Sequence, residues 1–323
     1  MTTDISVLIV SFNTRDRLRD CLLALRNQVG GIQFESVVVD NASRDGSVDM
    51  VQAEFPEIKL IQSSVNLGFG NGNNLALKHA KSRYLVLLNS DALLEPHALS
   101  MALAHMESAA NVGMGGGRLV DPDGGWQPSA RRFPSLLDEF LTISGLAAKF
   151  PKSRFFGRFD RTWANPNEAA QVDWVPGAFA IIRKDLIEKI GFFDPRFFLY
   201  YEEVDLCRRI KAAGYAVHYW PDLKISHIGG ESSKTLNEMS FTSKGSQLTL
   251  WRIRSQLLFY RKWHGSLMAW LVKKQEQSWH SLRALRNRNR DTLKFSESEN
   301  LVKLWDQAWL DTQGGQISPP QPW

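Results

Sequence analysis

The sequence has few cysteines and no long apolar run, which argues against a disulfide-rich protein and against a membrane-spanning one. Cys21 and Cys207 are its two cysteines among 323 residues, too few for a disulfide framework, which favours a reducing compartment such as the cytoplasm. The most apolar long stretch, 136–150, is interrupted by three charged residues, whereas a bilayer span needs roughly 18–20 apolar residues in a row. The N-terminus enters an apolar strand without a basic leader, so we expect neither a signal peptide nor an integral membrane protein.

Several motifs of common nucleotide and metal sites are also missing. The phosphate-loop pattern GxxxxGK[ST] is absent, and GFGNG (68–72) does not complete GxGxxG, which excludes a P-loop NTPase and a conventional dinucleotide-binding dehydrogenase. A calcium loop starting at Asn41 would carry Gln52 instead of Glu at its twelfth position and would follow a predicted strand, so calcium is excluded. Neither cysteine has the spacing of a zinc ligand.

Acidic residues are scarce between residues 244 and 294, where Glu276 and Asp291 face many Lys and Arg side chains, while the net charge of the whole chain is +5. Trp and Leu residues interleave with these basic residues from Trp251 to Leu271. This pattern favours an anionic partner such as membrane headgroups, a polyanionic acceptor or nucleic acid, although no recognised nucleic-acid motif accompanies it. A helical cap on a catalytic domain or on a second subunit is the alternative.

The first two thirds of the chain alternates apolar runs with helical periodicity. Strands are predicted at 5–10, 36–40, 58–62, 84–88, 178–183 and 224–226, and helices around 18–25, 48–54, 73–80 and 202–213, with Pro96 in the first turn of another helix and Gly214 ending the last. This alternation predicts an α/β fold with a doubly wound, mostly parallel sheet. Residues 113–126 and 129–157 fit neither period and are predicted to form excursions around a site.

Three polar clusters, 11–13, 40–43 and 89–91, follow predicted strands. A single cluster is often only a turn, but ligands of open α/β sheets bind beyond the carboxyl ends of the strands, so three at one edge favour a site. Asp91 suits a hard divalent cation that bridges to diphosphate oxygens.

Carboxylates also gather beside an aromatic run at 197–207, where Glu202, Glu203 and Asp205 follow two Phe and two Tyr residues. One of them can act as a general base, or all can favour the positive end of a helix dipole. His227, before a Gly-Gly pair, is either structural or a metal ligand.

Together these segments resemble the family 2 glycosyltransferases of the GT-A fold, and bacterial rhamnosyltransferase-like members in particular. The matching stretches are SVLIVSFN (6–13), VVVDNASRDGS (37–47), NLGFGNGNN (66–74), LLNSDALLEP (87–96), VDWVPGAF (172–179), FFDPRFFLYYEEVDLCRRI (192–210) and HIGGESS (227–233). They occur in the family's order across residues 5–233, more than two thirds of the chain.

The resemblance implies a GT-A catalytic domain over residues 1–232 and a basic, aromatic-rich helical extension over 233–323. It implies inverting transfer of a sugar from a nucleotide diphosphate-sugar, with Mg²⁺ or Mn²⁺, to a lipid-linked or polysaccharide acceptor in cell-envelope glycan synthesis. L-rhamnose from dTDP-rhamnose is the candidate donor. The expected location is the cytoplasm, with peripheral contact of the extension at the inner face of the plasma membrane, and a homodimer is left open.

The resemblance also assigns site residues. Glu203 matches the catalytic base, one methylene longer than the family's Asp, and Glu202 precedes it. Asp91 matches the last residue of the metal-binding DxD motif, and His227 matches a second metal ligand. The first position of the motif is Asn89 here, so the site has one anionic ligand fewer than a DxD site. The nucleotide-sugar residues implied are Ser11, Asn13, Asp40, Asn41, Gly68, Asn74, Asn89, Ser90 and Asp91, and Trp174 and Gly177 match a stretch that lines the sugar and acceptor pocket. Arg131 and Arg132 are candidates to contact phosphate or acceptor, with a solvated surface as the alternative.

A sugar nucleotidylyltransferase and an inactive family member are the alternatives to a glycosyltransferase. A sugar nucleotidylyltransferase is expected to carry an N-terminal glycine-rich loop with Arg and Lys for the triphosphate, and SVLIVSFNTRDRL lacks the glycines. A catalytically inactive family member that serves as a membrane-associated assembly partner is expected to have lost its base and metal positions. Asp91, Glu203 and His227 are all present.

Overall fold

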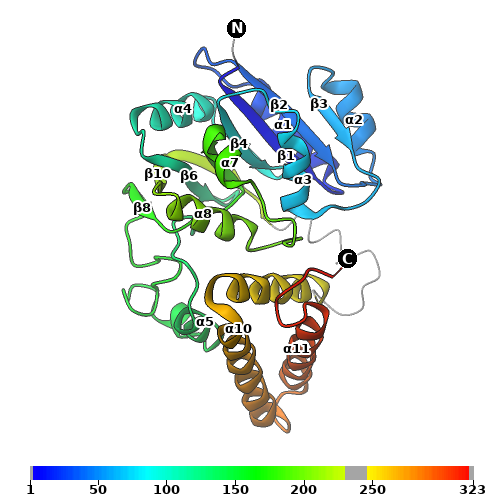
Figure 1. The fold of residues 1–323 in the computed structure, drawn as a ribbon, viewed down its shortest axis with the longest axis vertical. Helices are drawn as coiled ribbons and strands as arrows, with labels where there is room; N and C mark the ends of the chain where they lie inside the picture. The colour runs from blue at the N-terminus through cyan, green and yellow to red at the C-terminus, as the bar shows by residue number, and fades with distance from the viewer. Residues whose placement is uncertain (1–2, 230–245, 320–323) are drawn as a thin grey trace. The chain divides into compact units, whose positions relative to one another are not determined.

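The computed structural model describes residues 3–229 and 246–319, and these form two compact units (Figure 1). The first unit contains 3–132, 164–194 and 203–229, and the second contains 133–163, 195–202 and 246–319. The predicted division into 1–232 and 233–323 follows the chain, whereas the second unit also includes two internal segments. Residues 230–245, around the predicted boundary and the end of the HIGGESS stretch, lie outside the described residues.

The first unit is built on one sheet with the strand order β3-β2-β1-β4-β9-β6-β10-β5, to which β7 and β8 add at β6 and β10. The strands are β1 (Ile5–Ser11), β2 (Phe34–Asp40), β3 (Lys59–Gln62), β4 (Tyr84–Asn89), β5 (Ala92–Leu94), β6 (Val112–Val120), β7 (Trp126–Gln127), β8 (Ala170–Val172), β9 (Phe179–Arg183) and β10 (Ala216–His227). The first four strands in sequence pair in parallel, and β9 is antiparallel to both β4 and β6. The parallel half of the sheet agrees with the prediction, whereas the other half contains both parallel and antiparallel strand pairs.

The helices of this unit are placed by apolar side chains that recur every three or four residues. They are α1 (Arg15–Arg26), α2 (Ser47–Glu54), α3 (Gly68–Leu77), α4 (Ala98–Ser108), α7 (Lys184–Ile190) and α8 (Glu202–Ala212). On α1, Leu18, Cys21, Leu22 and Leu25 form the buried face. Gly214 ends α8 as predicted, with φ +86°, while its N–H bonds to the Lys211 carbonyl at 3.0 Å.

Strand β6 lies where the sequence predicts a loop, because its segment VGMGGGRLV is rich in glycine. The glycines reflect close packing: a Cβ on Gly115 would lie 1.7 Å from Cζ3 of Trp220, and one on Gly117 would lie 2.3 Å from the Leu223 carbonyl oxygen. Trp220 and Leu223 belong to β10, which pairs with β6. Only glycine leaves room for the indole ring, so this strand has no period-2 apolar pattern to recognise.

Other differences are shifts of boundaries. Strand β10 begins at Ala216, eight residues before the predicted 224, and is interrupted by a bulge after Trp220, next to Pro221. Helix α3 begins at Gly68, inside the glycine run, and not at 73. Pro96 precedes α4, which begins at Ala98, and does not form its first turn.

The second unit is helical, with α5 (Leu136–Ile143), α6 (Leu146–Lys149), α10 (Ser246–Asn287) and α11 (Thr292–Asp311). Helix α10 is bent at Gly265, whose φ of 81° and ψ of 176° are not helical, and it packs along α11 (Figure 1). Asp291 caps α11 by accepting the Lys294 N–H at 3.0 Å. The predicted helical C-terminal region is confirmed.

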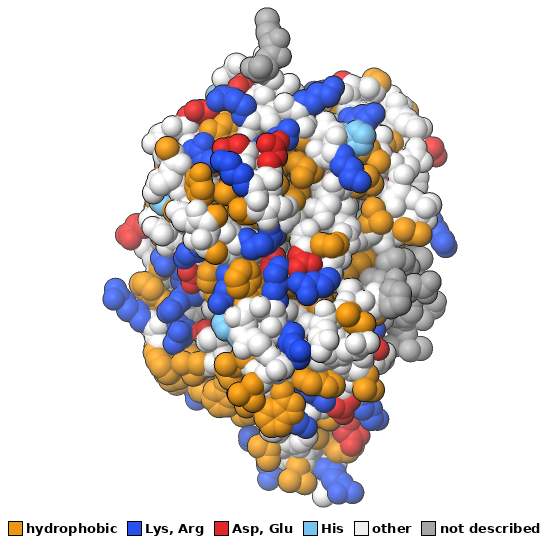
Figure 2. Space-filling view, viewed as in Figure 1, with side chains coloured by type: hydrophobic (Ala, Val, Ile, Leu, Met, Phe, Trp, Pro, Cys, Tyr) orange, Lys and Arg blue, Asp and Glu red, His pale blue; other side chains and the backbone are white. Residues whose placement is uncertain are grey.

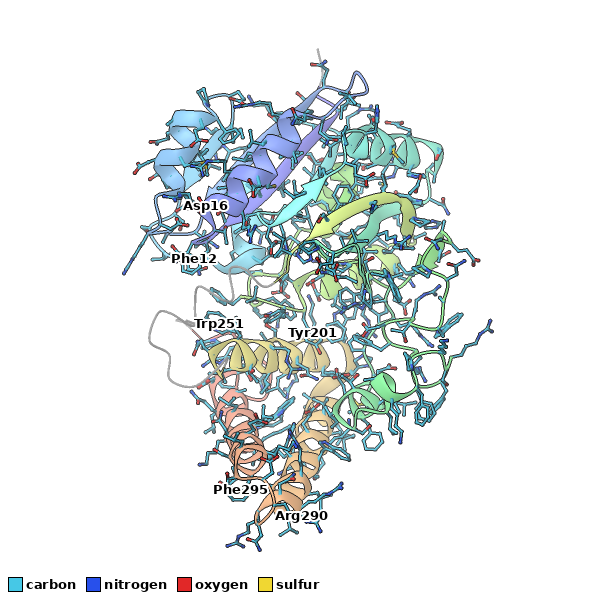
Figure 3. All side chains as sticks on the ribbon, turned by 180° about the vertical axis from the view of Figure 1, so that it is seen from behind. Phe12, Asp16, Tyr201, Trp251, Arg290 and Phe295 are labelled. Carbon is cyan, nitrogen blue, oxygen red and sulfur yellow. The ribbon has the colours of Figure 1, made fainter. Side chains whose placement is uncertain are left out.

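Helix α10 holds the segment 195–202 within this unit. The Phe198 and Trp251 rings lie 4.7 Å apart, and Ser255 Oγ donates to the Leu199 carbonyl at 2.8 Å. Figure 3 shows Tyr201 and Trp251 along the first half of α10. Tyr201 has a φ of 68°, rare for a bulky residue, and its hydroxyl donates to Glu139 Oε1 at 3.2 Å. These contacts hold the backbone in a conformation that it would not adopt alone.

Glu139 on α5 is the centre of a polar cluster in this unit. The hydroxyls of Tyr201 and Tyr260 both donate to its Oε1 at 3.2 Å. Burial, followed by the neighbouring charge of Glu276, raises the pKa of Glu139 from 4.5 to about 7. The folded protein therefore retains a proton at pH values where the unfolded chain has released it.

We expect stability to fall as pH rises from about 4.5 to above 7, because the folded state binds more protons than the unfolded state in that window. Since Glu139 is partly exposed, the expected loss is about 1–3 kcal/mol of unfolding free energy. Glu139→Gln should remove most of this pH dependence in urea unfolding at pH 5 and pH 8. Glu299→Gln, the same change at an exposed α11 position, should retain it. Equal pH dependence in wild type and Glu139→Gln would contradict the prediction.

Candidate active site

The three polar clusters predicted from the sequence meet at one edge of the sheet. Ser11 is in register with Asp40 across β1 and β2, and Val10 is in register with Asn89 across β1 and β4. Thr14, which no motif in the sequence marks, connects them: its Oγ1 lies 3.0 Å from Ser11 Oγ and 2.9 Å from Ser90 Oγ. This hydroxyl chain ties the end of β1 to the loop after β4.

Asp40 offers a buried acceptor at this edge. Its Oδ1 accepts the Ser43 N–H at 2.9 Å, and Ser43 Oγ in turn accepts the Asn13 N–H at 2.9 Å. Asn13 has a φ of 50°, a conformation that Asn tolerates better than most residues. Asp40 Oδ2 is buried and has no hydrogen-bond partner in the part of the chain that the structure describes. An orphaned carboxylate oxygen costs free energy unless a ligand donor reaches it.

Two of the predicted nucleotide residues use their amides inside the protein. Asn41 donates to the Gly68 carbonyl at 3.1 Å and accepts the Leu67 N–H at 3.2 Å. Asn74 forms a similar pair with the backbone of Phe193, at 2.9 and 3.1 Å. Both side chains fix the glycine-rich start of α3, so their contribution to a ligand site is its shape.

Asn89, Asp91 and His227 form the predicted metal cluster. His227 Nε2 lies 3.4 Å from Asp91 Oδ1 and 3.4 Å from Asn89 Nδ2. The backbone brings them together, because β5 pairs with β10 and sets Ala92 opposite His227. Asp91 is buried, and the described residues contain no group of three or more His, Cys, Asp or Glu side chains that could hold a metal. The donor set is one carboxylate, one imidazole and one amide.

Gln127 orients His227, and no pattern in the sequence around it indicated this role. Its Nε2 donates to the His227 carbonyl at 2.8 Å, which leaves its Oε1 facing His227 Nδ1 at 3.0 Å. An amide oxygen can only accept, so Nδ1 carries a proton, and Nε2 is the ring nitrogen that faces Asn89 and Asp91 and could bind a cation. Metal-binding histidines are commonly fixed by such a partner on the other ring nitrogen.

The donor set fits a divalent cation. Carboxylate and amide oxygens suit Mg²⁺ and Mn²⁺, and an imidazole nitrogen favours Mn²⁺ or a later transition metal over Mg²⁺. With three protein groups, further positions are open to diphosphate oxygens and water.

Glu203 lies in the first turn of α8 and is partly exposed, but its Oε2 is shielded from solvent and accepts no hydrogen bond from the described residues. Burial raises the pKa of the Glu203 carboxyl, while its own backbone N–H, the Arg131 charge and the Gly177 N–H act in the opposite direction. The neighbouring Glu202 is buried, and it ends the segment 195–202 of the second unit.

Arg131, whose charge acts on Glu203, packs against Trp174. Their backbones are bridged, and the Arg131 guanidinium lies 5.0 Å from the centre of the Trp174 ring. Trp174 Nε1 donates to the carbonyl of Arg132, whose side chain is exposed. A Cβ on Gly177 would lie 2.8 Å from the Phe69 ring, so glycine permits this close approach.

One short backbone segment connects the two clusters. The Asn89 N–H donates to the Ala178 carbonyl at 3.1 Å, and the N–H of Gly177, the preceding residue, lies near enough to the Glu203 carboxylate to lower its pKa. The predicted metal cluster and the carboxylate therefore adjoin neighbouring residues of one segment. Strand β9, which begins at Phe179, fixes this segment by pairing with β4.

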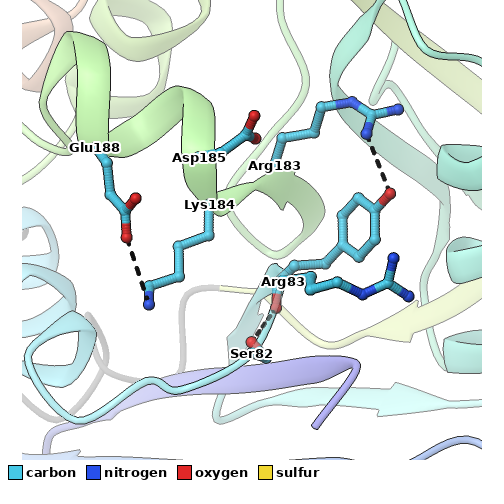
Figure 4. Close-up of a pocket in the computed structure, with 7 residues that line it drawn as sticks. Ser82, Arg83, Arg183, Lys184, Asp185 and Glu188 are labelled. Atoms are coloured by element: carbon cyan, nitrogen blue, oxygen red, sulfur yellow. Dashed lines mark hydrogen bonds and ion pairs between the residues drawn. The ribbon is translucent and has the colours of Figure 1, made fainter. Parts of the chain in front are cut away.

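A concave region lies at the amino end of β4 (Figure 4). It has a volume of about 310 Å³ and is lined by Ser82, Arg83, Tyr84, Arg183, Lys184, Asp185 and Glu188. Its charged side chains already have partners: Lys184 pairs with Glu188 at 3.5 Å, Arg183 bonds to Tyr84 Oη at 3.1 Å, and Arg83 pairs with Asp4 and Glu107. This region belongs to the amino end of β4, away from the polar edge.

The profile of the family described as Glycosyl transferase family 2 matches residues 6–191, more than half of the chain. The chain belongs to this family. The predicted membership is confirmed, and the match does not favour the nucleotidylyltransferase or the inactive assembly partner. The matched span includes the Asp40 and Asn89–Asp91 clusters of this glycosyltransferase but ends before Glu203 and His227.

Among curated relatives, the glycosyltransferase is 26% identical over 208 residues to N-acetylglucosaminyl-diphospho-decaprenol L-rhamnosyltransferase of Mycobacterium tuberculosis, covering 61% of this chain and 67% of that protein. It is also 26% identical to rhamnosyltransferase WbbL of Escherichia coli, over 54% of this chain and 66% of the other. Among solved structures, the mannosyltransferase PcManGT of Pyrobaculum calidifontis, in complex with GDP-Man and Mn²⁺, aligns with a TM-score of 0.56 at 14% identity, covering 96% of this chain and 88% of that chain. This likeness confirms the predicted fold class.

Proposed function

We propose that this glycosyltransferase moves a sugar from a nucleotide diphosphate-sugar to a lipid-linked or polysaccharide acceptor, with inversion at the anomeric carbon. The observation that carries the proposal is that two clusters adjoin neighbouring residues: the Asn89 N–H donates to the Ala178 carbonyl, and the Gly177 N–H lowers the pKa of the Glu203 carboxyl. This proximity supports a single site that contains the Asn89–Asp91–His227 cluster and the Glu203 carboxylate.

Glu203 would act as the general base. Its unsatisfied Oε2 can accept the proton of an acceptor hydroxyl as that oxygen attacks the sugar. A pKa raised by burial brings the carboxylate closer to the basicity that this task needs. Inversion needs a single displacement and no covalent intermediate, so one carboxylate is sufficient.

The cluster of Asn89, Asp91 and His227 would hold Mg²⁺ or Mn²⁺. When bound, such a cation supplies positive charge to the departing diphosphate. Asp40 Oδ2, buried and without a partner among the described residues, would accept an N–H of the nucleotide base. Ser11, Asn13, Gly68 and Ser90 shape this end of the site.

The rhamnosyltransferases of M. tuberculosis and E. coli support the finer assignment. We propose L-rhamnose, carried by dTDP, as the donor sugar, and cell-envelope glycan synthesis as the process. Arg131, Arg132, Trp174 and Gly177 would contact the sugar or acceptor, with Arg131 already held by the Trp174 ring. The enzyme would work in the cytoplasm, at the inner face of the plasma membrane, and a homodimer is compatible with this assignment.

Gln127→Leu should weaken Mn²⁺ binding about 10–100-fold, because His227 loses the acceptor that fixes its ring proton on Nδ1. Gln127→Glu keeps the acceptor for His227 Nδ1 but loses the donor to the His227 carbonyl, so it should retain more affinity than Gln127→Leu. The measurement is a calorimetric titration of Mn²⁺ in the presence of dTDP. Unchanged affinity in Gln127→Leu would show that Gln127 does not position a ligand.

The proposed function is tested by a thermal-shift screen of nucleotide sugars with and without Mn²⁺, followed by transfer assays on the donors that stabilise the protein. We expect dTDP-rhamnose to raise the melting temperature, and to do so more with Mn²⁺. If only a different nucleotide sugar stabilises the protein, that sugar is the donor and the assignment of dTDP-rhamnose is wrong. If no nucleotide sugar stabilises the protein, the proposal fails.

A further inference from the structure

The second half of α10 carries an exposed apolar face. Leu267, Trp270, Lys274, Ser278, Leu282 and Leu285 are spaced three or four residues apart, so they share one side of the helix. Leu267, Leu282 and Leu285 are 68%, 64% and 70% exposed, values that are unusual for leucines of a packed helix. We call Leu267, Trp270, Leu282 and Leu285 the outer face of α10.

Helix α5 widens this surface. The Gln275 amide donates to the Leu136 carbonyl at 2.9 Å, and the Phe140 ring lies 5.9 Å from the Trp279 ring, so α5 lies against α10. Leu137 and Phe140 on α5 are themselves exposed. Figure 2 shows hydrophobic side chains gathered over this part of the second unit, with Lys and Arg around them. A contiguous apolar patch of this kind marks an interaction surface.

The exposed charged side chains on the second half of α10 have one sign. Within residues 266–290, all of which the structure describes, the exposed charged side chains are Lys274, Arg286, Arg288 and Arg290. The one acidic residue of this stretch, Glu276, is buried. Figure 3 shows Arg290 at the tip where α10 gives way to α11, and Leu293, which follows it, is also exposed. The surface thus combines exposed leucines, a tryptophan and positive charge.

This combination matches an anionic bilayer better than a second copy of the chain. A two-fold contact would set Lys274 and Arg286 against the same residues of the other copy, with no exposed acid of 266–290 to pair with them. In a bilayer interface, leucines enter the acyl boundary, tryptophan lies at headgroup level and arginines bind lipid phosphates. No helix among the described residues is long and apolar enough to cross a membrane, so contact here would be interfacial.

We propose that the outer face of α10, extended by α5 and by the basic α10–α11 tip, docks into the interface of a membrane that contains anionic lipid. The docking surface adds to the proposed function by naming where an enzyme with a lipid-linked acceptor contacts the bilayer. It rests on the proposed function only for the lipid-linked nature of the acceptor. The helix lies in the plane of the membrane, with its buried side still packed on α11.

The test is co-sedimentation of the full-length protein with phosphatidylglycerol–phosphatidylcholine vesicles and with phosphatidylcholine vesicles at low salt. Wild type should bind the anionic vesicles more tightly. Leu282→Ser/Leu285→Ser should lower binding at least tenfold. Arg286→Ser/Arg288→Ser/Arg290→Ser should lose the preference for anionic lipid, because each arginine contributes about fivefold to the affinity for anionic vesicles.

Leu310→Ser is the matched control, because Leu310 on α11 is equally exposed and lies beside Asp311, which pairs with Arg254 in the first half of α10. It should bind like wild type. Equal binding by all variants would overturn the proposal, and so would a dimer in light scattering that Leu282→Ser/Leu285→Ser dissociates. Glu203→Gln should bind vesicles like wild type, so a failure of the proposed chemistry is distinguishable from a failure of docking.

Discussion

Sugar transfer by a Glu203→Gln variant is expected to fall about 10²–10⁴-fold in kcat, the usual contribution of a general base. Glutamine keeps the size of the side chain and can still accept the Gly177 N–H, so the site should keep its shape. It cannot take a proton from an acceptor hydroxyl. Binding of the nucleotide sugar, measured by calorimetry, should therefore stay close to that of wild type.

The neighbouring acid supplies the control for this prediction. Glu202→Gln makes the same change one residue earlier, in the segment that belongs to the second unit, and should affect kcat much less. Wild-type kcat/KM should also rise with pH through the raised pKa of Glu203, because only the ionised carboxylate is a base. Full activity in Glu203→Gln together with loss in Glu202→Gln would move the base to Glu202.

The second large effect is expected from Asp91→Ala, which should remove Mn²⁺-dependent donor binding and lower kcat/KM by on the order of 10²-fold or more. Asp91 is the one carboxylate in a cluster that otherwise offers the His227 imidazole and the Asn89 amide, so little remains to attract a cation. Donor affinity with Mn²⁺ and with a chelator measures the effect. Wild type should bind more weakly with the chelator, and Asp91→Ala should be insensitive to it.

Asn89→Asp provides the opposite change. It supplies a second carboxylate at the position that faces His227, and should tighten Mn²⁺ binding because a charged oxygen replaces a neutral amide. If Asp91→Ala binds the donor as tightly as wild type with Mn²⁺ present, the metal assignment is wrong.

The parallel half of the sheet could be predicted from the sequence because its signal is local. Strands β1 and β4 and the VVV segment of β2 are largely β-branched or apolar runs, which is how a strand buried on both faces is composed. Strand β6 could not be predicted, because its glycines make room for residues far along the chain, such as Trp220 against Gly115 and Leu223 against Gly117 on a strand about a hundred residues later. Such a requirement becomes visible only when the two strands lie side by side.

The candidate site was predictable by residue type but not by role. Asp40, Asp91 and His227 lie at or just after the ends of β2, β4 and β10, which the fold brings to one edge of the sheet, and Glu203 lies in the first turn of α8. Asn41 and Asn74 have the same chemistry as ligand-binding amides, but their partners are backbone groups of the protein. Gln127 lies between two stretches, 113–126 and 129–157, that fit neither period, so no local pattern marked its contact with His227.

The two units are interleaved along the chain, which changes from one to the other after residues 132, 163, 194 and 202 as well as before the C-terminal helices. No single cut separates them. A protein truncated before α10 would leave Phe198 and Tyr201 without the Trp251, Ser255 and Tyr260 side chains that surround their segment. The helical region is therefore not a cassette that recombination could exchange between enzymes, and a chimera would need to transfer the internal segments together with it.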